Sequence, residues 1–158
     1  MEKIWFKIEK HQVELFVNSA VTGLDPLNKT ITTINGDYYS YRKLLLATGG
    51  SPRKLPFSPE DPRVIYYHSL DDYERLRSFI ETSGSIGVVG GGFIGSEITA
   101  ALTKNGKNVT MIFPEDGIGG RIFPGKLSDF LTNLYRSRGI QVYTNSAVSS
   151  IDSREKHL

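Results

Sequence analysis

Three glycines in the middle of the chain, Gly90, Gly92 and Gly95, have the spacing G-x-G-x-x-G. They follow the short apolar run 86–89 and precede a helical pattern of apolar residues, the setting in which this spacing holds the pyrophosphate of a dinucleotide. The first glycine permits the tight turn, the second lets the backbone approach the pyrophosphate, and the third lets the helix pack against the strand. Free N–H groups and the helix dipole then attract the phosphates. The alternative is a glycine-rich connection without a ligand, and the strand–turn–helix context favours the dinucleotide site.

A dinucleotide site of this kind also uses an acid about 20 residues further on, which accepts hydrogen bonds from the adenosine ribose. Glu115 lies at this distance from Gly95, although Phe113 and Pro114 occupy the end of the expected strand. A carboxylate beside the ribose hydroxyls repels a 2′-phosphate, so Glu115 favours NAD over NADP. An acid of a solvated loop is the alternative. Arg121 is a nearby cation that would weaken this preference or contact the pyrophosphate.

A second glycine cluster, residues 117–120, has a different pattern. It lacks a third glycine at the required spacing and lies between Pro114 and Pro124. Glycine and proline at such density are typical of a connection between regular elements. We therefore interpret the second glycine cluster as a loop.

The composition excludes several other kinds of chemistry. The chain has 158 residues, a net charge of +2, 16 glycines and no cysteine, so disulfides, thiolate metal sites, iron–sulfur clusters and a cysteine nucleophile are excluded. The 19 Lys and Arg residues are scattered among 17 Asp and Glu residues, which does not indicate a nucleic-acid partner. No run approaches the roughly 20 apolar residues that span a bilayer. The sequence is typical of a soluble globular chain, and we expect no membrane span.

The residues around the first glycines predict alternating strands and helices. Ser69 and Asp72 have the spacing of a capping box, at the start of a helix that continues to Gly84. Strands separated by helical patterns are expected at 86–89, 108–113 and 140–143. This order is the doubly wound α/β pattern of a Rossmann-like domain, with right-handed crossovers.

The first third of the chain has short β-rich runs between turn residues. The runs 13–17, 21–24, 29–34 and 38–41 predict an antiparallel meander of about three strands. Asn35 and Gly36 favour a type I′ hairpin turn, because both residues tolerate positive φ. The apolar run 44–47 ends at glycines and predicts a strand that is buried on both faces. A proline-rich connection, 51–62, follows it, and we place a domain boundary soon after.

The motifs together resemble one family of enzymes. Residues 90–97 (GGGFIGSE), 113–115 (FPE) and 121–124 (RIFP) are similar to the NADH-binding domain of the apoptosis-inducing factor and rubredoxin (ferredoxin) reductase branch of the FAD-dependent pyridine nucleotide-disulfide oxidoreductases. Residues 41–53 (YRKLLLATGGSPR) are similar to the segment that ends the first part of that family's FAD-binding domain. Monodehydroascorbate reductases share the FPE-like segment but usually carry Leu in place of Ser96, so we favour the apoptosis-inducing-factor-like group.

The resemblance implies that residues 1–66 are part of an FAD-binding domain and that 67–158 are an NADH-binding domain. NADH would pass a hydride to FAD where these domains meet, and the protein would supply binding and orientation rather than a catalytic acid or base. The residues implied to contact NAD are Gly90, Gly91, Gly92, Phe93, Ile94, Gly95, Glu97, Glu115 and Arg121, and those implied to contact FAD are Thr48, Gly49 and His68.

Within this set the resemblance gives particular roles. Phe93 would shield the flavin until the nicotinamide displaces it, Glu97 would lie near the nicotinamide, and Glu115 and Arg121 would lie on the adenosine side. Plainer alternatives are packing at a helix start for Phe93, an exposed helix acid for Glu97 and a loop histidine for His68.

The sequence also departs from the family pattern. The family's first G-x-G-x-x-G, which holds the FAD pyrophosphate, has no counterpart here, and the resemblance implies a chain that begins and ends inside the family's domains. We expect the chain to be a segment of an NADH-dependent oxidoreductase that binds NAD(H). By itself it should bind little or no FAD and should be inactive. The alternative is a stand-alone NAD(H)-binding module. The expected partners are the rest of the FAD-binding domain and an electron-acceptor protein or quinone, and a homodimer is left open. The expected compartment is the cytoplasm, or the mitochondrion for a eukaryotic apoptosis-inducing factor.

Overall fold

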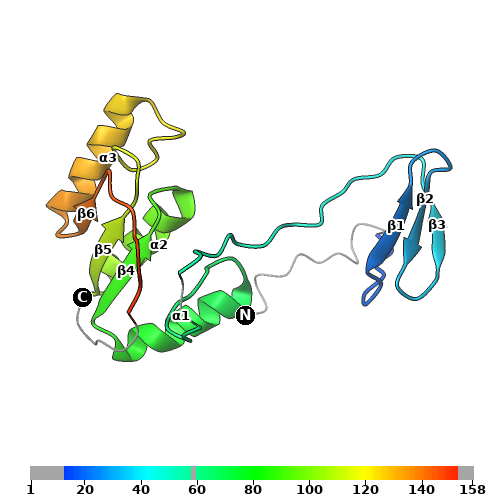
Figure 1. Ribbon diagram of the computed structural model, residues 1–158, viewed down its shortest axis with the longest axis horizontal. Helices are drawn as coiled ribbons and strands as arrows, with labels where there is room; N and C mark the ends of the chain where they lie inside the picture. Colours follow the sequence, from blue (N-terminus) through cyan, green and yellow to red (C-terminus); the bar gives the residue numbers. More distant parts are fainter. Residues whose placement is uncertain (1–12, 58–59, 153–158) are drawn as a thin grey trace. The chain divides into compact units, whose positions relative to one another are not determined.

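The structure, a computed structural model, describes residues 13–57 and 60–152. The chain forms two compact units, Met1–Gly49 and Gly50–Leu158, and each is described here by itself. The first unit contains β1 (Val21–Asp25), β2 (Thr30–Thr33) and β3 (Tyr38–Ser40). The second contains, in chain order, α1 (Leu70–Thr82), β4 (Ser85–Val89), α2 (Phe93–Lys104), β5 (Asn108–Ile112), α3 (Gly125–Ser137) and β6 (Gln141–Tyr143) (Figure 1).

The first unit is an antiparallel meander in the order β1-β2-β3, as the β-rich runs predict. The turn between β2 and β3 differs from the prediction, because Gly36 has a positive φ of 85° but Asn35 does not. The Gly36 amide donates to the Thr33 carbonyl, and the Thr33 amide donates to the Asp37 carbonyl, both at 3.0 Å. These bonds define a three-residue loop, a type I turn followed by a left-handed glycine. The predicted type I′ turn is therefore wrong, since a loop of this length needs only one left-handed residue.

Two expected strands, 13–17 and 44–47, are not formed in the described part of the chain. Their apolar side chains are largely exposed, with Val17 at 67% and Leu45 at 86%. Phe16 contacts the ring of Tyr39 on β3, with ring centroids 4.9 Å apart. Both runs have strand-forming composition, but a strand also needs a neighbour that accepts its backbone hydrogen bonds. Among the described residues, neither run pairs with a strand of the meander.

The second unit contains a parallel sheet in the order β4-β5-β6, as the doubly wound pattern predicts. Ile86 pairs with Val109, and Met111 pairs with Val142. Helix α2 connects β4 to β5, and α3 connects β5 to β6. Because the strands are parallel, their carboxyl ends lie along one edge of the sheet, where ligands bind in folds of this type.

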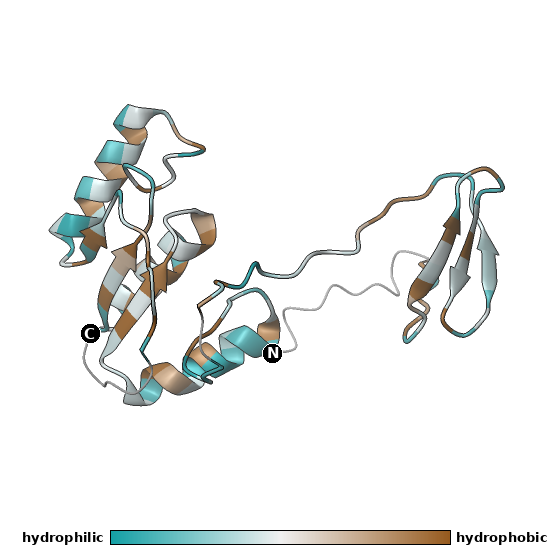
Figure 2. Cartoon of the chain, viewed as in Figure 1, coloured by the Kyte–Doolittle hydropathy of each residue, from teal (hydrophilic) through white to brown (hydrophobic). Residues whose placement is uncertain are grey.

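The core of the second unit is centred on β5 and the residues that follow it. Met111 is 0% exposed and Phe113 is 1% exposed. The other buried hydrophobic residues of this core are Leu102, Val109, Ile118, Ile140 and Val142. Figure 2 shows hydrophobic residues along strands β4 and β5. Since Phe113 and Ile118 follow β5, the loop at the carboxyl end of this strand is itself part of the core.

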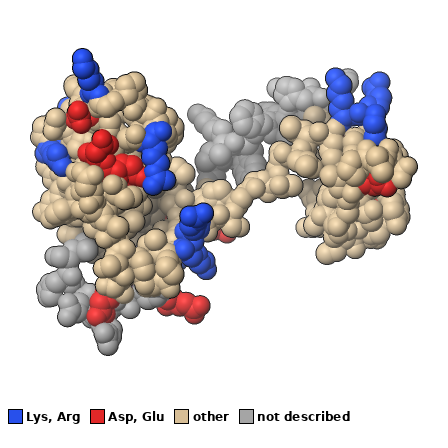
Figure 3. Space-filling model, turned by 45° about the horizontal axis from the view of Figure 1, so that its top comes forward, with Lys and Arg blue, Asp and Glu red and all other residues tan. Residues whose placement is uncertain are grey.

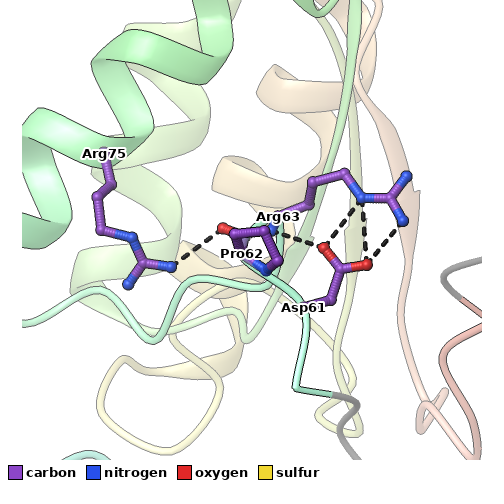
Figure 4. A network of polar contacts seen from close by, with 4 residues as sticks. All are labelled: Asp61, Pro62, Arg63 and Arg75. Atoms are coloured by element: carbon purple, nitrogen blue, oxygen red, sulfur yellow. Dashed lines mark hydrogen bonds and ion pairs between the residues drawn. The ribbon is translucent and has the colours of Figure 1, made fainter.

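Helix α1 begins with the predicted capping box. The Ser69 hydroxyl accepts a hydrogen bond from the Asp72 amide at 3.2 Å, and the Asp72 carboxylate accepts one from the Ser69 amide at 2.9 Å. Hydrogen bonds from the amide of Ser69, and then from its hydroxyl, lower the pKa of Asp72. On the next turn Arg75 donates to the carbonyl of Pro62 at 3.0 Å (Figure 4). The helix is thereby joined to the proline-rich connection that precedes it.

Candidate functional site

The turn between β4 and α2 has the backbone geometry expected of the G-x-G-x-x-G spacing. Gly90 has a φ of 119°, which only glycine adopts readily. A Cβ on Gly95 would overlap the carbonyl oxygen of Gly90, so the third glycine lets the helix begin close to the strand. Gly92 is the N-cap of α2 and offers no side-chain cap, and a Cβ placed on it would meet nothing within 4 Å. The start of α2 therefore has open space and free amides where a phosphate would bind.

Gly91 has a role that the sequence analysis missed. It is buried, and a Cβ at this position would lie 2.7 Å from the ring of Phe113. Its carbonyl accepts a hydrogen bond from the amide of Gly119 at 2.8 Å. The turn after β4 thus lies directly against the loop after β5. The only sequence signal was a fourth glycine, which lies inside the motif at a position that the motif leaves free.

The structure brings Glu115 and Arg121 together. The Nε atom of Arg121 lies 2.5 Å from Oε1 of Glu115, with the Glu115 side chain 19% exposed and that of Arg121 77% exposed. The Glu115 carbonyl also accepts a hydrogen bond from the Asn145 amide at 2.8 Å, which ties the loop to the residues after β6. Glu115 is therefore an ion-paired, largely covered acid rather than a freely solvated one.

The second glycine cluster, residues 117–120, is a loop, as interpreted from the sequence, but Gly117, Ile118 and Gly119 are buried. The Ile118 amide donates to the hydroxyl of Thr132 at 2.9 Å, and the hydroxyl of Ser128 donates to the Ile118 carbonyl at 2.9 Å. Both hydroxyls belong to α3. Their i, i+4 spacing places the two hydroxyls on one face of the helix. Small polar residues on a helix ordinarily indicate a solvated face, so the sequence analysis missed this buried contact.

Phe93 and Glu97 lie on the first turns of α2. The side chain of Phe93 is 54% exposed, and its ring contacts that of Phe123 edge-on, with centroids 5.5 Å apart. Ile94 is also 54% exposed and Glu97 is exposed. Close by, the hydroxyl of Tyr135 donates to the Ser96 carbonyl at 3.0 Å. Burial, with the negative charge of Glu97 as a smaller contribution, raises the pKa of Tyr135.

The residues implied to contact FAD are not brought into one site by the described structure. Thr48 and Gly49 belong to the first unit and are exposed, and Gly49 has a φ of 69°. His68 belongs to the second unit, where its amide donates to the Asp72 carboxylate at 3.1 Å. Its side chain is one of those that line a hollow between the proline-rich connection and α1.

The described residues offer no other obvious chemistry. Among them, no group of three or more His, Asp or Glu side chains is placed to hold a metal ion. In the same ranges no helix is both long and apolar enough to span a membrane. Acidic and basic side chains lie beside one another on the face of the second unit that Figure 3 shows.

The comparison with protein families gives a match that spans nearly the whole chain. Residues 3–158 match the family described as pyridine nucleotide-disulphide oxidoreductase. Among curated proteins, the chain is 35% identical over 153 residues to peroxisomal monodehydroascorbate reductase 1 of Oryza sativa subsp. japonica, covering 93% of this chain and 32% of that protein. It is 34% identical over 154 residues to the ferredoxin–NAD(+) reductase component of the 3-phenylpropionate/cinnamic acid dioxygenase of Photorhabdus laumondii, covering 97% and 39%. Because the two identities are nearly equal, they do not distinguish the monodehydroascorbate reductases from the apoptosis-inducing-factor-like and ferredoxin reductase group, which the sequence analysis favoured because of Ser96.

Among solved structures, the chain is similar to the water-forming NADH oxidase of Lactobacillus brevis bound to NADH. The TM-score is 0.73 at 26% identity, over 86% of this chain and 32% of the oxidase. The chain thus spans about a third of the length of the proteins it matches.

Proposed function

Because the chain belongs to the pyridine nucleotide-disulphide oxidoreductase family, we propose that it binds NAD(H) at the turn between β4 and α2. The pyrophosphate would lie on the amides at the start of α2, beside Gly92. The adenosine ribose would lie against Glu115, and the nicotinamide would extend toward Phe93 and Glu97. In this proposal the chain is the NADH-binding part of an oxidoreductase.

The observation that carries this proposal is the conformation of residues 90–95. A left-handed Gly90, a Gly95 in contact with the Gly90 carbonyl and an uncapped Gly92 beside open space are what a pyrophosphate requires of a strand–turn–helix unit. An ordinary connection between a strand and a helix needs none of the three. The likeness to an oxidase bound to NADH supports the same ligand.

The preference between NADH and NADPH follows from Glu115. Its carboxylate is largely covered and is held in place by Arg121. Two oxygens in a fixed position can accept hydrogen bonds from the ribose hydroxyls, whereas a 2′-phosphate would add negative charge beside them. We therefore assign NADH as the preferred ligand and Arg121 as the partner that holds the acid.

For the longer proteins of the family, we propose that this segment presents NADH to FAD. Bound FAD would supply the hydride acceptor there. Thr48, Gly49 and His68 would contact FAD, Phe93 would cover its face, and the domain boundary would lie near residues 66/67. An electron-acceptor protein fits the ferredoxin–NAD(+) reductase relative, and a quinone is the other acceptor class. A chain that binds NADH and transfers no electrons is the second candidate, with the same site.

Titration of the 158-residue chain with NADH, followed by calorimetry or nucleotide fluorescence, tests the proposal. We expect saturable binding, with NADPH binding more weakly. Neither candidate is expected to oxidise NADH as the 158-residue chain alone. A longer chain that includes the rest of the FAD-binding domain separates the two candidates, since it should oxidise NADH with an artificial electron acceptor only if the segment belongs to an oxidoreductase. A chain that folds but shows no saturable NADH binding contradicts the proposal.

A further inference from the structure

The second glycine cluster lies on two hydroxyl groups of α3. A Cβ on Gly117 would lie 2.5 Å from the Ser128 hydroxyl oxygen and 2.9 Å from that of Thr132. Only glycine therefore lets the loop lie this close to the helix. Both hydroxyls are buried, with Ser128 at 2% and Thr132 at 3% exposure, and each forms a hydrogen bond with Ile118 in the same segment.

The same segment contacts both parts of the candidate dinucleotide site. On one side the amide of Gly119 donates to the carbonyl of Gly91, inside the turn that would hold the pyrophosphate. On the other side, the second glycine cluster lies between Glu115 and Arg121 in the chain. Its fold brings the side chains of these two residues into an ion pair. The carbonyl of Gly119 also accepts hydrogen bonds from the amides of Ile122 and Phe123 at 2.8 Å, which close the rest of the loop.

We propose that Ser128 and Thr132 are positioning residues of the dinucleotide site. They do not contact the ligand; they hold residues 117–119 so that Glu115 and the turn after β4 are in place before the ligand arrives. This inference rests on the proposed NAD(H) site. If a substitution leaves the loop in place in only a tenth of the molecules, the apparent dissociation constant rises about tenfold, because only the remaining fraction is competent to bind.

Thr132→Val tests the proposal, because it keeps the shape of the side chain and removes the hydroxyl. Thr103→Val is the matched control. Thr103 lies on α2, and its hydroxyl donates to the carbonyl four residues before it at 2.8 Å, as that of Thr132 does. Thr103 has no bond to the loop among those the structure gives it. Thr132→Ser restores the hydroxyl and should behave as the wild type, and Ser128→Ala removes the second contact.

Two measurements are made on the 158-residue chain: hydrogen exchange at the amides of Ile118 and Gly119, and the dissociation constants of NADH and NADPH. We expect Thr132→Val to speed exchange at both amides at least about tenfold and to raise the dissociation constant of NADH about tenfold. The change for NADPH should be smaller, so that the preference for NADH narrows. Unchanged exchange, or faster exchange with unchanged NADH binding, overturns the positioning role. A wild-type chain that binds neither dinucleotide overturns the proposed function as well, so the two failures are distinguishable.

Discussion

Replacing Glu115 by glutamine should narrow the preference for NADH over NADPH. The change removes one negative charge and keeps the size of the side chain, and it leaves Arg121 without the ion pair that the structure gives it. At a separation of about 6 Å, one unit charge of a 2′-phosphate and a carboxylate repel by roughly 0.7 kcal/mol in water and 2.8 kcal/mol at an effective dielectric constant of 20. The Glu115 side chain is 19% exposed and that of Arg121 is 77% exposed, so a repulsion energy between these limits, about 1–2 kcal/mol, is appropriate. This energy corresponds to a roughly 5- to 30-fold change in the ratio of the NADPH and NADH dissociation constants.

The assay is competitive titration of NADH and NADPH at low and at high salt. Glu115→Gln should raise affinity for NADPH and lower affinity for NADH a few-fold, and salt should reduce the effect on NADPH. Arg121→Gln should act in the opposite direction, because it leaves the carboxylate unneutralised and so widens the preference. Asp129→Asn is the control for net charge, since Asp129 is exposed on α3. If Glu115→Gln changes the ratio no more than Asp129→Asn, Glu115 does not face the ribose.

Two further outcomes are expected from the described geometry. Gly95→Ala should lower the free energy of unfolding by about 1–3 kcal/mol in denaturant, because its Cβ has no room beside the carbonyl of Gly90. Gly92→Ala should leave stability nearly unchanged and weaken NADH binding, because its Cβ would enter the open space beside the turn. Equal losses of stability in the two variants would contradict the assignment of this space to the ligand. The start of α1 should become less stable in acid, because the pKa of Asp72 is lowered in the folded chain. The stabilisation that the Asp72 carboxylate gives is therefore fully present above its ordinary pKa of about 3.9. This stabilisation is lost as the pH falls through the lower pKa of the folded chain. The protection factors of the amides at the start of α1, which are corrected for the intrinsic pH dependence of exchange, should therefore fall below about pH 4 in the wild type and much less in Asp72→Asn. Equal pH dependence of the protection factors would show that Asp72 does not cap the helix.

The parallel unit was predictable because its elements have strong local signals. The spacing of apolar residues places β4, β5 and β6 within one residue of the expected strands, and the capping box at Ser69 marks the start of α1 correctly. Each of these signals is contained within about ten residues of sequence. The G-x-G-x-x-G turn belongs to the same class, since strand, turn and helix follow one another directly.

The missed features depend on contacts between distant residues. Residues 44–47 have the composition of a buried strand, but burial and pairing need a neighbour that composition cannot supply. The support of the second glycine cluster by Ser128 and Thr132 was missed for a similar reason. The segment and the hydroxyls are separated by 10 and 14 positions along the chain and meet only because α3 folds back along the sheet.

The contact between Gly91 and Phe113 limits how this site can change during evolution. The ring of Phe113 occupies the space that any side chain at position 91 would need, and Phe113 is 1% exposed, so the ring cannot turn out into solvent without opening the core. Homologous chains with a larger residue at position 91 should therefore carry a smaller one at position 113, with the total volume of the pair preserved. The same exchange should apply between position 117 and the two hydroxyl-bearing positions of α3. Such paired changes would reshape the phosphate turn and the ribose loop together, so substitutions at these packed positions should occur in coupled pairs rather than singly.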